Sequence, residues 1–173
     1  MPQGVPSDFY ADLIGIARKE NVPTFLDSSG DALRKGVEAG PFLVKPNETE
    51  AKTLLGVGAT DSFDPADVAS VISTKYRVNV LLSLGANGAI AAKSGEIFWV
   101  KNPSVEAKSA VGSGDCMLGG LIYGLLNNLS FEESVRYGVA AGAANTLTIG
   151  AGKFRIEDFE RLRGQVHISH EVG

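Results

Sequence analysis

The sequence is poor in the residues that build disulfide frameworks and zinc sites. Among its 173 residues there are one cysteine and two histidines. A single cysteine excludes an intramolecular disulfide. His167 and His170 have no cysteine or further histidine near them that would complete a zinc site. No apolar run is long enough to span a bilayer, and no signal-peptide pattern begins the chain. We therefore expect a cytoplasmic protein that does not enter the membrane.

A strong excess of charge is also absent. The 16 Lys and Arg residues nearly balance 20 Asp and Glu residues, which gives a formal net charge of −4. This slight acidity argues against a non-specific nucleic-acid binder. The sequence contains neither the Gly-x-x-x-x-Gly-Lys-Ser/Thr of P-loop enzymes nor the Gly-x-Gly-x-x-Gly of dinucleotide-binding folds. With 44% hydrophobic residues, the chain can form the core of one domain or part of one.

Short apolar segments alternate with helical patterns along the chain. We expect strands at 23–26, 42–44, 79–84, 88–92 and 97–100, and helices at 7–21, 31–38, 47–55, 64–76, 115–127, 130–148 and 156–163. The alternation predicts a three-layer α/β/α fold with a mostly parallel central sheet. In such folds, ligands bind beyond the carboxyl ends of the strands.

The segment Gly112-Ser113-Gly114-Asp115 stands at the start of an apolar helical run. Glycines at a helix entrance let backbone N–H groups converge on an anion, and the helix dipole adds partial positive charge. Asp115, in the first turn, is placed to accept a proton from a hydroxyl group. The pattern is typical of phosphoryl transfer. A tight turn with Asp115 as an ordinary helix cap is the alternative.

Asn47 and Glu50 begin another helix directly after a strand. Together they could hold Mg²⁺, directly or through water, and Lys45 beside them is a candidate phosphate contact. The alternative is a capping box, in which both side chains serve only the helix.

Two further stretches are candidate nucleotide contacts. Ser83, Gly85 and Gly88 follow the most apolar strand, where glycines would let the backbone approach a nucleotide. The alternative is a glycine turn between two strands. Asn145 lies among small residues that could leave room for an adenine, although a satisfied core amide in a closely packed helix has the same pattern.

The helix expected at 130–148 has a capping-box pattern from Ser130 to Glu133. We expect Glu132, Glu133 and Arg136 on its solvated face. Cys116 is more typical of a small packing residue than of a nucleophile.

Taken together, three motifs resemble the PfkB, or ribokinase-like, family of sugar kinases. They are residues 45–50 (KPNETE), 83–89 (SLGANGA) and 110–115 (AVGSGD), in the order and approximate spacing of the family. Residues 2–6 and 26–30 resemble the branch that contains 1-phosphofructokinase and tagatose-6-phosphate kinase. The resemblance covers essentially the whole chain and implies a ribokinase-like fold.

The resemblance also implies a role for each candidate residue. Asp115 would be the base that deprotonates the acceptor hydroxyl, and Gly112, Ser113 and Gly114 would form the anion hole. Asn47 and Glu50 would govern Mg²⁺ and phosphate binding. The positions implied as ATP contacts are Lys45, Asn47, Ser83, Gly85, Gly88 and Asn145. The implied substrate is a phosphorylated ketohexose, and the full-length family protein could be a homodimer.

The chain departs from the family in one large respect. Family members have roughly as much sequence again before the point that corresponds to Met1, and it carries the sugar-binding motif, central strands and a lid. Residues 1–173 would then be the nucleotide-binding and catalytic C-terminal portion, with an exposed sheet edge and little activity alone. The alternatives are a non-catalytic nucleotide-binding module, a degenerate kinase remnant, or an α/β domain whose motifs are only caps and turns.

Overall fold

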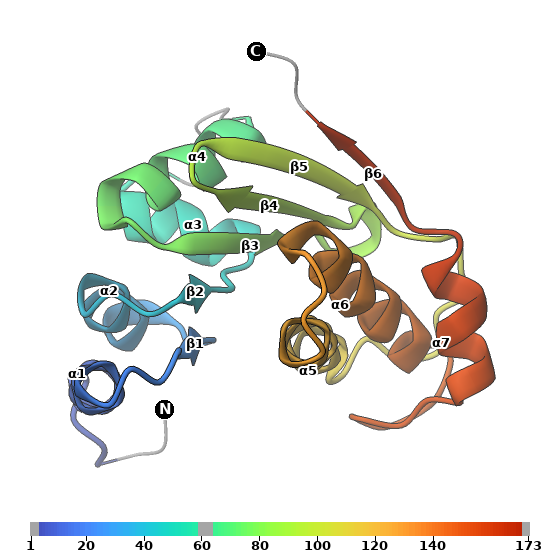
Figure 1. Ribbon diagram of the computed structural model, residues 1–173, viewed down its shortest axis with the longest axis horizontal. Coiled ribbons are helices and arrows are strands. Elements are labelled where there is room, and N and C mark those ends of the chain that lie inside the picture. Colours follow the sequence, from blue (N-terminus) through green and yellow to red (C-terminus); the bar gives the residue numbers. More distant parts are fainter. Residues whose placement is uncertain (1–3, 59–63, 171–173) are drawn as a thin grey trace. The chain divides into compact units, whose positions relative to one another are not determined.

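The computed structural model describes residues 4–58 and 64–170, which form helices and strands in the α/β order that the sequence predicts (Figure 1). Pro2 and Gln3, part of the segment that suggested the kinase branch, lie outside the described residues. The first elements are α1 (Phe9–Lys19), β1 (Phe25–Leu26), α2 (Gly30–Glu38), β2 (Leu43–Val44), α3 (Glu48–Leu55), α4 (Pro65–Tyr76) and β3 (Asn79–Ser83). A short 3₁₀ turn (Gly85–Asn87), β4 (Ala89–Lys93), β5 (Glu96–Lys101), α5 (Ser113–Leu126), α6 (Phe131–Thr146), α7 (Ile156–Arg163) and β6 (His167–His170) follow.

The described chain divides into two compact units. The first runs up to Leu84 and includes Ile90–Ile97, and the second comprises Gly85–Ala89 and the residues from Phe98 onward. Strands are hydrogen-bonded in the order β1-β2-β3-β4-β5-β6.

In the first unit, β1, β2 and β3 are parallel, as predicted. Phe25 is in register with Leu43, and Leu43 with Asn79. The side chains of Val80, Leu81 and Leu82 are fully buried, which explains why β3 reads as a continuous apolar run in the sequence.

Among the described residues, no strand pairs with the outer edge of β1. The carbonyls of Thr24 and Leu26 accept hydrogen bonds from the β2 side. Because peptide groups alternate in direction along a strand, those of Phe25 face the open edge. A groove of about 290 Å³ lies between this strand and α1. Its lining is mostly apolar: Tyr10, Leu13, Ile14, Ala17, Thr24, Phe25 and Leu26.

In the second unit, α5 and α6 lie side by side at a distance that only glycines permit (Figure 1). A Cβ atom on Gly138 would lie 2.6 Å from the Met117 carbonyl oxygen, and one on Gly120 would lie 2.6 Å from that of Tyr137. The small residues of α6 therefore serve close helix packing, which is the alternative to an adenine pocket that the sequence left open.

β6 is a strand that the sequence analysis did not predict. It pairs antiparallel with β5, with Phe98 opposite His170 and Lys101 opposite His167. The residues of β6 are largely exposed, so they lack the apolar alternation by which a strand is recognised. The parallel arrangement is thus observed for β1 to β3, whereas the pair at the end of the strand order is antiparallel.

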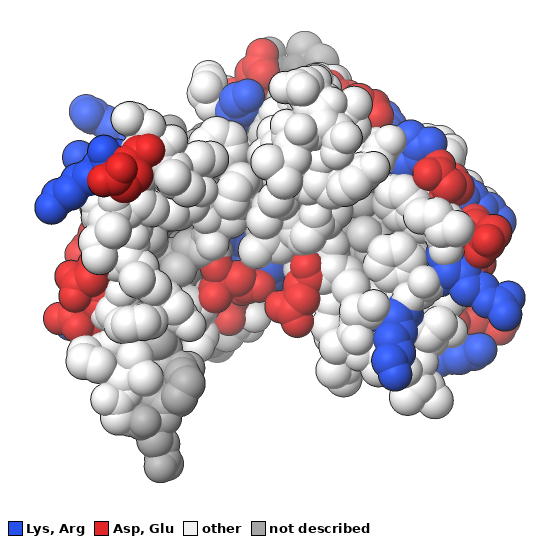
Figure 2. Space-filling model, turned by 60° about the horizontal axis from the view of Figure 1, so that its bottom comes forward, with Lys and Arg blue, Asp and Glu red and all other residues white. Residues whose placement is uncertain are grey.

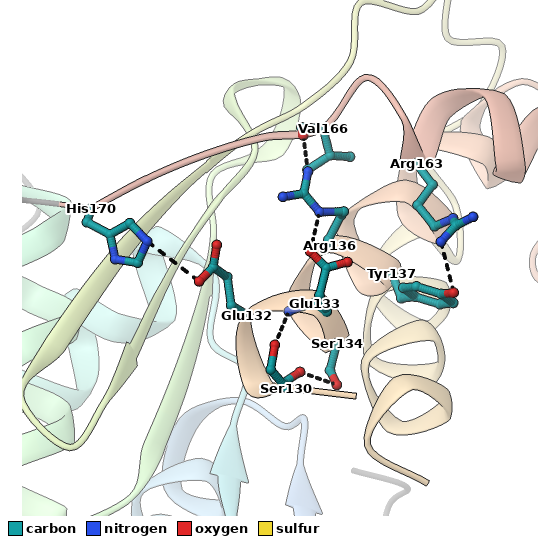
Figure 3. A network of polar contacts seen from close by, with 9 residues as sticks. All are labelled: Ser130, Glu132, Glu133, Ser134, Arg136, Tyr137, Arg163, Val166 and His170. Atoms are coloured by element: carbon teal, nitrogen blue, oxygen red, sulfur yellow. Dashed lines mark hydrogen bonds and ion pairs between the residues drawn. The ribbon is translucent and has the colours of Figure 1, made fainter. Parts of the chain in front are cut away.

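The start of α6 corrects two predictions (Figure 3). Ser130 Oγ accepts a hydrogen bond from the Glu133 N–H at 3.1 Å, but the Glu133 carboxylate binds Arg136 Nε at 2.9 Å. Only half of the predicted capping box is therefore formed. Arg136 also donates to the Val166 carbonyl. Its predicted place on a solvated face is wrong, because its guanidinium ties α6 to the segment before β6.

Two side-chain contacts extend this link between α6 and the end of the chain (Figure 3). Arg163 of α7 donates to the Tyr137 hydroxyl at 2.9 Å, and His170 of β6 lies 3.5 Å from the Glu132 carboxylate. α7 and β6 are thus held to α6 by side-chain contacts as well as by core packing.

Several helix boundaries differ from the predictions. α5 begins at Ser113 rather than at residue 115 and ends at Leu126, and α1 ends at Lys19 rather than at residue 21. α1 begins after Asp8 rather than Ser7, and Asp8 makes no side-chain cap hydrogen bond. α6 ends at Thr146 instead of Thr148. The residues after it turn away to form backbone contacts near the start of α5.

Figure 2 shows one face of the molecule, on which acidic and basic side chains lie in small groups and most of the surface is uncharged. No single sign of charge covers this face. Within the described residues, no helix combines the length and apolar character needed to cross a membrane.

Candidate functional site

The carboxyl ends of β2 and β3 lie beside each other in the first unit. Asn47 and Ser83 form a parallel bridge, and the Ser83 N–H donates to the Pro46 carbonyl at 3.0 Å. Parallel strands end at the same edge of a sheet, so the sequence predicted that the segments after these strands would meet. The structure confirms this.

Lys45 is placed at this edge by an ion pair. Its Nζ lies 2.8 Å from Asp27 Oδ2, and the two side chains are 7% and 31% exposed. A lysine this deeply buried needs a partner to offset the loss of its hydration, and Asp27, directly after β1, provides it. The pair fixes the ammonium at the strand ends, where the sequence placed a phosphate contact.

Asn47 and Glu50 form a complete capping box at the start of α3. Asn47 Oδ1 accepts from the Glu50 N–H at 2.9 Å, and Glu50 Oε2 accepts from the Asn47 N–H at 2.8 Å. The structural alternative left open by the sequence is therefore observed. The capping box uses only one oxygen of the Glu50 carboxylate, Oε2, and the second oxygen can still accept a hydrogen bond or bind a cation.

The two residues fit Mg²⁺ only as minor protein ligands. Among the residues that the structure describes, no group of three or more Asp, Glu, His or Cys side chains could hold a metal ion. Mg²⁺ commonly retains several waters and binds through one or two carboxylates and substrate phosphates. A free oxygen on Glu50 matches this kind of site.

In the second unit, the turn at Gly85–Asn87 is held by Asn102, the residue directly after β5. The Asn102 amide donates to the Gly85 carbonyl at 2.8 Å. Gly85 is exposed, whereas Gly88 is buried. Gly88 has a φ of +101°, and a Cβ there would lie 2.0 Å from the Val100 carbonyl oxygen. Gly88 is thus required for the close approach of two backbones, and the glycine-turn interpretation applies to it.

The start of α5 has no side-chain cap. Gly112 is the N-cap residue with a left-handed φ of +78°, and the Ser113 hydroxyl donates backward to the Ala110 carbonyl at 2.8 Å. Within the described part of the chain, the backbone N–H groups of Gly112, Gly114 and Asp115 have no acceptor. Three unpaired N–H groups at a helix N-terminus provide an arrangement suited to an anion.

Gly112 must be glycine for a second reason. A Cβ atom at this position would lie 2.4 Å from the Cβ of Ala151. The left-handed turn therefore packs directly against the segment that follows α6.

Asp115 is the third residue of α5 and is exposed. Its carboxylate makes no hydrogen bond or ion pair with the described residues, so it remains available to an external hydroxyl. The following residue, Cys116, is partly covered. Burial raises the pKa of its thiol, a hydrogen bond with the Gly152 backbone lowers it, and the nearby Asp115 charge raises it further.

Asn145 lies at the end of α6 and is fully buried. Its Nδ2 donates to the Val111 carbonyl at 2.8 Å, and its Oδ1 accepts from the Lys153 N–H at 3.3 Å. Both ends of the amide are therefore paired within the protein. This is the satisfied core amide that the sequence offered as the alternative to a nucleotide contact.

Sequence reasoning missed two residues that shape these segments, Asn102 and Ala151. Asn102 precedes a proline after a strand, and this pattern indicates a turn. It does not indicate that the Asn102 amide binds the Gly85 carbonyl, 17 residues earlier in the chain. Ala151 lies between two glycines, and no local pattern indicates contact with Gly112.

Residues 1–157 match the pfkB family of carbohydrate kinases, and the chain belongs to this family. It is 30% identical over 98% of its length to a 1-phosphofructokinase of Vibrio cholerae, of which it covers 53%. It is 28% identical over 97% of its length to a tagatose-6-phosphate kinase of Staphylococcus epidermidis, of which it covers 55%.

The fold agrees with this assignment. Phosphofructokinase-2 from Escherichia coli superposes with a TM-score of 0.88 at 35% identity, with 95% of this chain and 54% of that chain covered. The chain therefore spans about half the length of the relatives that it matches. The predicted family, branch and ribokinase-like fold are confirmed.

Proposed function

We propose that this chain is the nucleotide-binding and catalytic portion of an ATP-dependent kinase that phosphorylates a hydroxyl of a phosphorylated ketohexose. The supporting observation is the start of α5, where three backbone N–H groups and the Asp115 carboxylate have no hydrogen-bond partner among the described residues. Family membership gives this arrangement its chemical interpretation.

Asp115 is the base of the proposed reaction. Its carboxylate accepts the proton of the sugar hydroxyl as the oxygen attacks the γ-phosphorus of ATP, and the bond to the β–γ bridging oxygen breaks. The N–H groups of Gly112, Gly114 and Asp115 then donate to the transferring phosphoryl group, whose charge they stabilise. Ser113 holds the turn through its bond to the Ala110 carbonyl.

The nucleotide would also contact residues at the strand ends. In this proposal Lys45, held by Asp27, faces phosphate oxygens, and Ser83 and the exposed Gly85 line the path of the ribose and phosphates. Asn47 and Glu50 would hold Mg²⁺ through water and the free carboxylate oxygen, and the ion would neutralise phosphate charge.

We expect the 173-residue chain to have little or no sugar kinase activity by itself. It covers only 53–55% of the two sequence relatives. The competing proposal is a nucleotide-binding module without catalysis. The catalytic proposal predicts turnover when this chain is combined with the other half of a related kinase, whereas the non-catalytic proposal predicts none.

The test has two stages. Titration calorimetry of the chain with ATP and Mg²⁺ should show binding, and incubation with fructose 1-phosphate, fructose 6-phosphate or tagatose 6-phosphate should give no ADP above background. A chimera, in which this chain replaces the matching portion of Escherichia coli phosphofructokinase-2, should then phosphorylate one of these sugars. A folded chimera that binds ATP without turnover would favour the non-catalytic module. Robust turnover by the chain alone would contradict its expected inactivity.

A further inference from the structure

Asn145 connects three segments of the second unit without reaching solvent. It is one of three buried polar or charged side chains among the described residues. Its donor end binds the Val111 carbonyl at 2.8 Å, just before the turn that starts α5. Its acceptor end binds the Lys153 N–H at 3.3 Å, in the segment that follows α6.

The bond to Val111 determines the direction of a neighbouring N–H group. The Val111 carbonyl and the Gly112 N–H belong to one planar trans peptide and point in opposite directions. When Asn145 holds the carbonyl on the protein side, the Gly112 N–H must point away from it. This N–H is one of the three that have no acceptor among the described residues.

Other contacts restrain the same two segments. The N–H groups of Lys108 and Ser109 both donate to the Thr146 carbonyl, at 2.7 and 3.2 Å. The Thr148 hydroxyl donates to the Asn145 carbonyl at 3.3 Å and also binds the Lys153 carbonyl. The last turn of α6 is therefore the common anchor of the segment before α5 and the segment that packs on Gly112.

We propose that Asn145 is a positioning residue that orients the Gly112 N–H toward the anion at the start of α5. The inference rests on the proposed function, because the anion is taken to be a phosphate of the nucleotide. In this proposal Asn145 does not contact the adenine. It acts on the ligand indirectly, by fixing the orientation of the peptide group between Val111 and Gly112. The two roles predict different ligand selectivity, since an adenine contact requires a base and a positioned N–H requires only phosphate.

The experiment compares Asn145→Ala with Ser134→Ala in the 173-residue chain. Ser134 is also fully buried in α6 and donates to the Ser130 carbonyl at 2.8 Å, so Ser134→Ala is a control that removes a buried hydrogen bond from the same helix away from Val111 and Lys153. Affinities for MgATP and for magnesium tripolyphosphate, which has no base, are measured by calorimetry. We expect Asn145→Ala to weaken both ligands by the same factor, about tenfold, and Ser134→Ala to change either by less than about twofold.

Selective loss of ATP affinity in Asn145→Ala would show a base contact and overturn the proposal. Unchanged affinity for both ligands, with a lower melting temperature, would show a structural role only and overturn it as well. If Asn145→Ala is unfolded at the assay temperature, Asn145→Leu, which keeps the volume, is measured in its place.

A second measurement separates this proposal from the proposed function. If the wild-type chain binds neither ligand, the nucleotide site is refuted, but the orientation of Gly112 is still measurable by amide NMR. Asn145→Ala should shift the Gly112 amide resonance, because the peptide plane is no longer held, whereas Ser134→Ala should leave it unchanged. Identical Gly112 behaviour in the two variants would overturn the positioning role.

Discussion

The starts of α3 and α5 have similar sequence patterns, but they differ in whether their first backbone N–H groups have hydrogen-bond acceptors. Each helix has an acidic residue at its third position, Glu50 in α3 and Asp115 in α5. Glu50 reaches back to the Asn47 N–H at 2.8 Å. Asp115 makes no such bond, because its side chain is one methylene shorter and its N-cap is a left-handed glycine without a side chain.

The comparison shows how a helix start becomes available to a ligand. At α3, the protein's own side chains satisfy the first N–H groups and stabilise the helix. At α5, those N–H groups stay without an acceptor among the described residues, and stability must come from packing against Ala151 and α6 instead. A helix start can thus favour the fold or an external anion, and the residue at the N-cap decides which.

The sharpest test of the comparison is Asp115→Asn in the chimera with Escherichia coli phosphofructokinase-2. Loss of a general base should lower kcat by about 10²–10⁴-fold, while ATP affinity stays nearly unchanged. Steady-state kinetics and calorimetry measure the two quantities. As a control, Glu50→Gln can still form a capping box, so it should change the dependence on Mg²⁺ concentration more than the stability. Equal loss of turnover and ATP binding in Asp115→Asn would make this residue structural.

Gly112→Ala should destabilise the fold more than an alanine at another left-handed glycine. At Gly112 the new Cβ would clash with Ala151 at 2.4 Å, whereas at Gly56, the C-cap of α3 with a φ of +71°, nothing lies within 4 Å. We expect a loss of roughly 2–3 kcal/mol for Gly112→Ala and about 1 kcal/mol for Gly56→Ala by urea unfolding. Equal losses would mean that the turn can move away from Ala151.

Asn47→Ala tests the capped member of the pair. Removing the N-cap acceptor should cost about 1 kcal/mol of stability in urea unfolding. Asn47→Asp retains an acceptor for the Glu50 N–H and should recover most of it. If Asn47→Ala were as stable as the wild type, the capping box would not contribute to folding.

The smallest expected effect concerns Cys116, one residue after Asp115. Burial raises the pKa of this thiol more than the hydrogen bond with the Gly152 backbone lowers it, although a helix start by itself favours the thiolate. A raised pKa leaves less thiolate at a given pH, so iodoacetamide should alkylate Cys116 more slowly at pH 8 than it alkylates free cysteine. The rate should rise through a midpoint above that of the free thiol. A midpoint below it would mean that the dipole dominates.

The sequence predicted correctly those features that follow from the alternation of strands and helices. The strand ends after β2 and β3 were expected to meet, and the Asn47–Ser83 bridge shows that they do. Both interpretations of Asn47 and Glu50 were available from the spacing, but only coordinates show the reciprocal bonds.

What the sequence could not supply are individual side-chain contacts and strand pairings that the alternation of strands and helices does not imply. The bond from Asn145 to Val111 spans 34 residues, and no periodicity encodes it. β6 was missed because its exposed polar residues become a strand only through pairing with β5. Arg136 was placed in solvent because its acceptor, the Val166 carbonyl, lies 30 residues further on.

The outer edge of β1 has a practical consequence for anyone who handles this chain. No described strand pairs with its peptide groups, which lie beside the apolar groove along α1. Phe9, Leu13 and Ile16 of that helix are exposed. An open apolar edge is a template for adding another strand. Protein concentration, more than temperature, is therefore expected to decide whether preparations stay monodisperse, and a soluble fusion partner should be kept attached until each measurement begins.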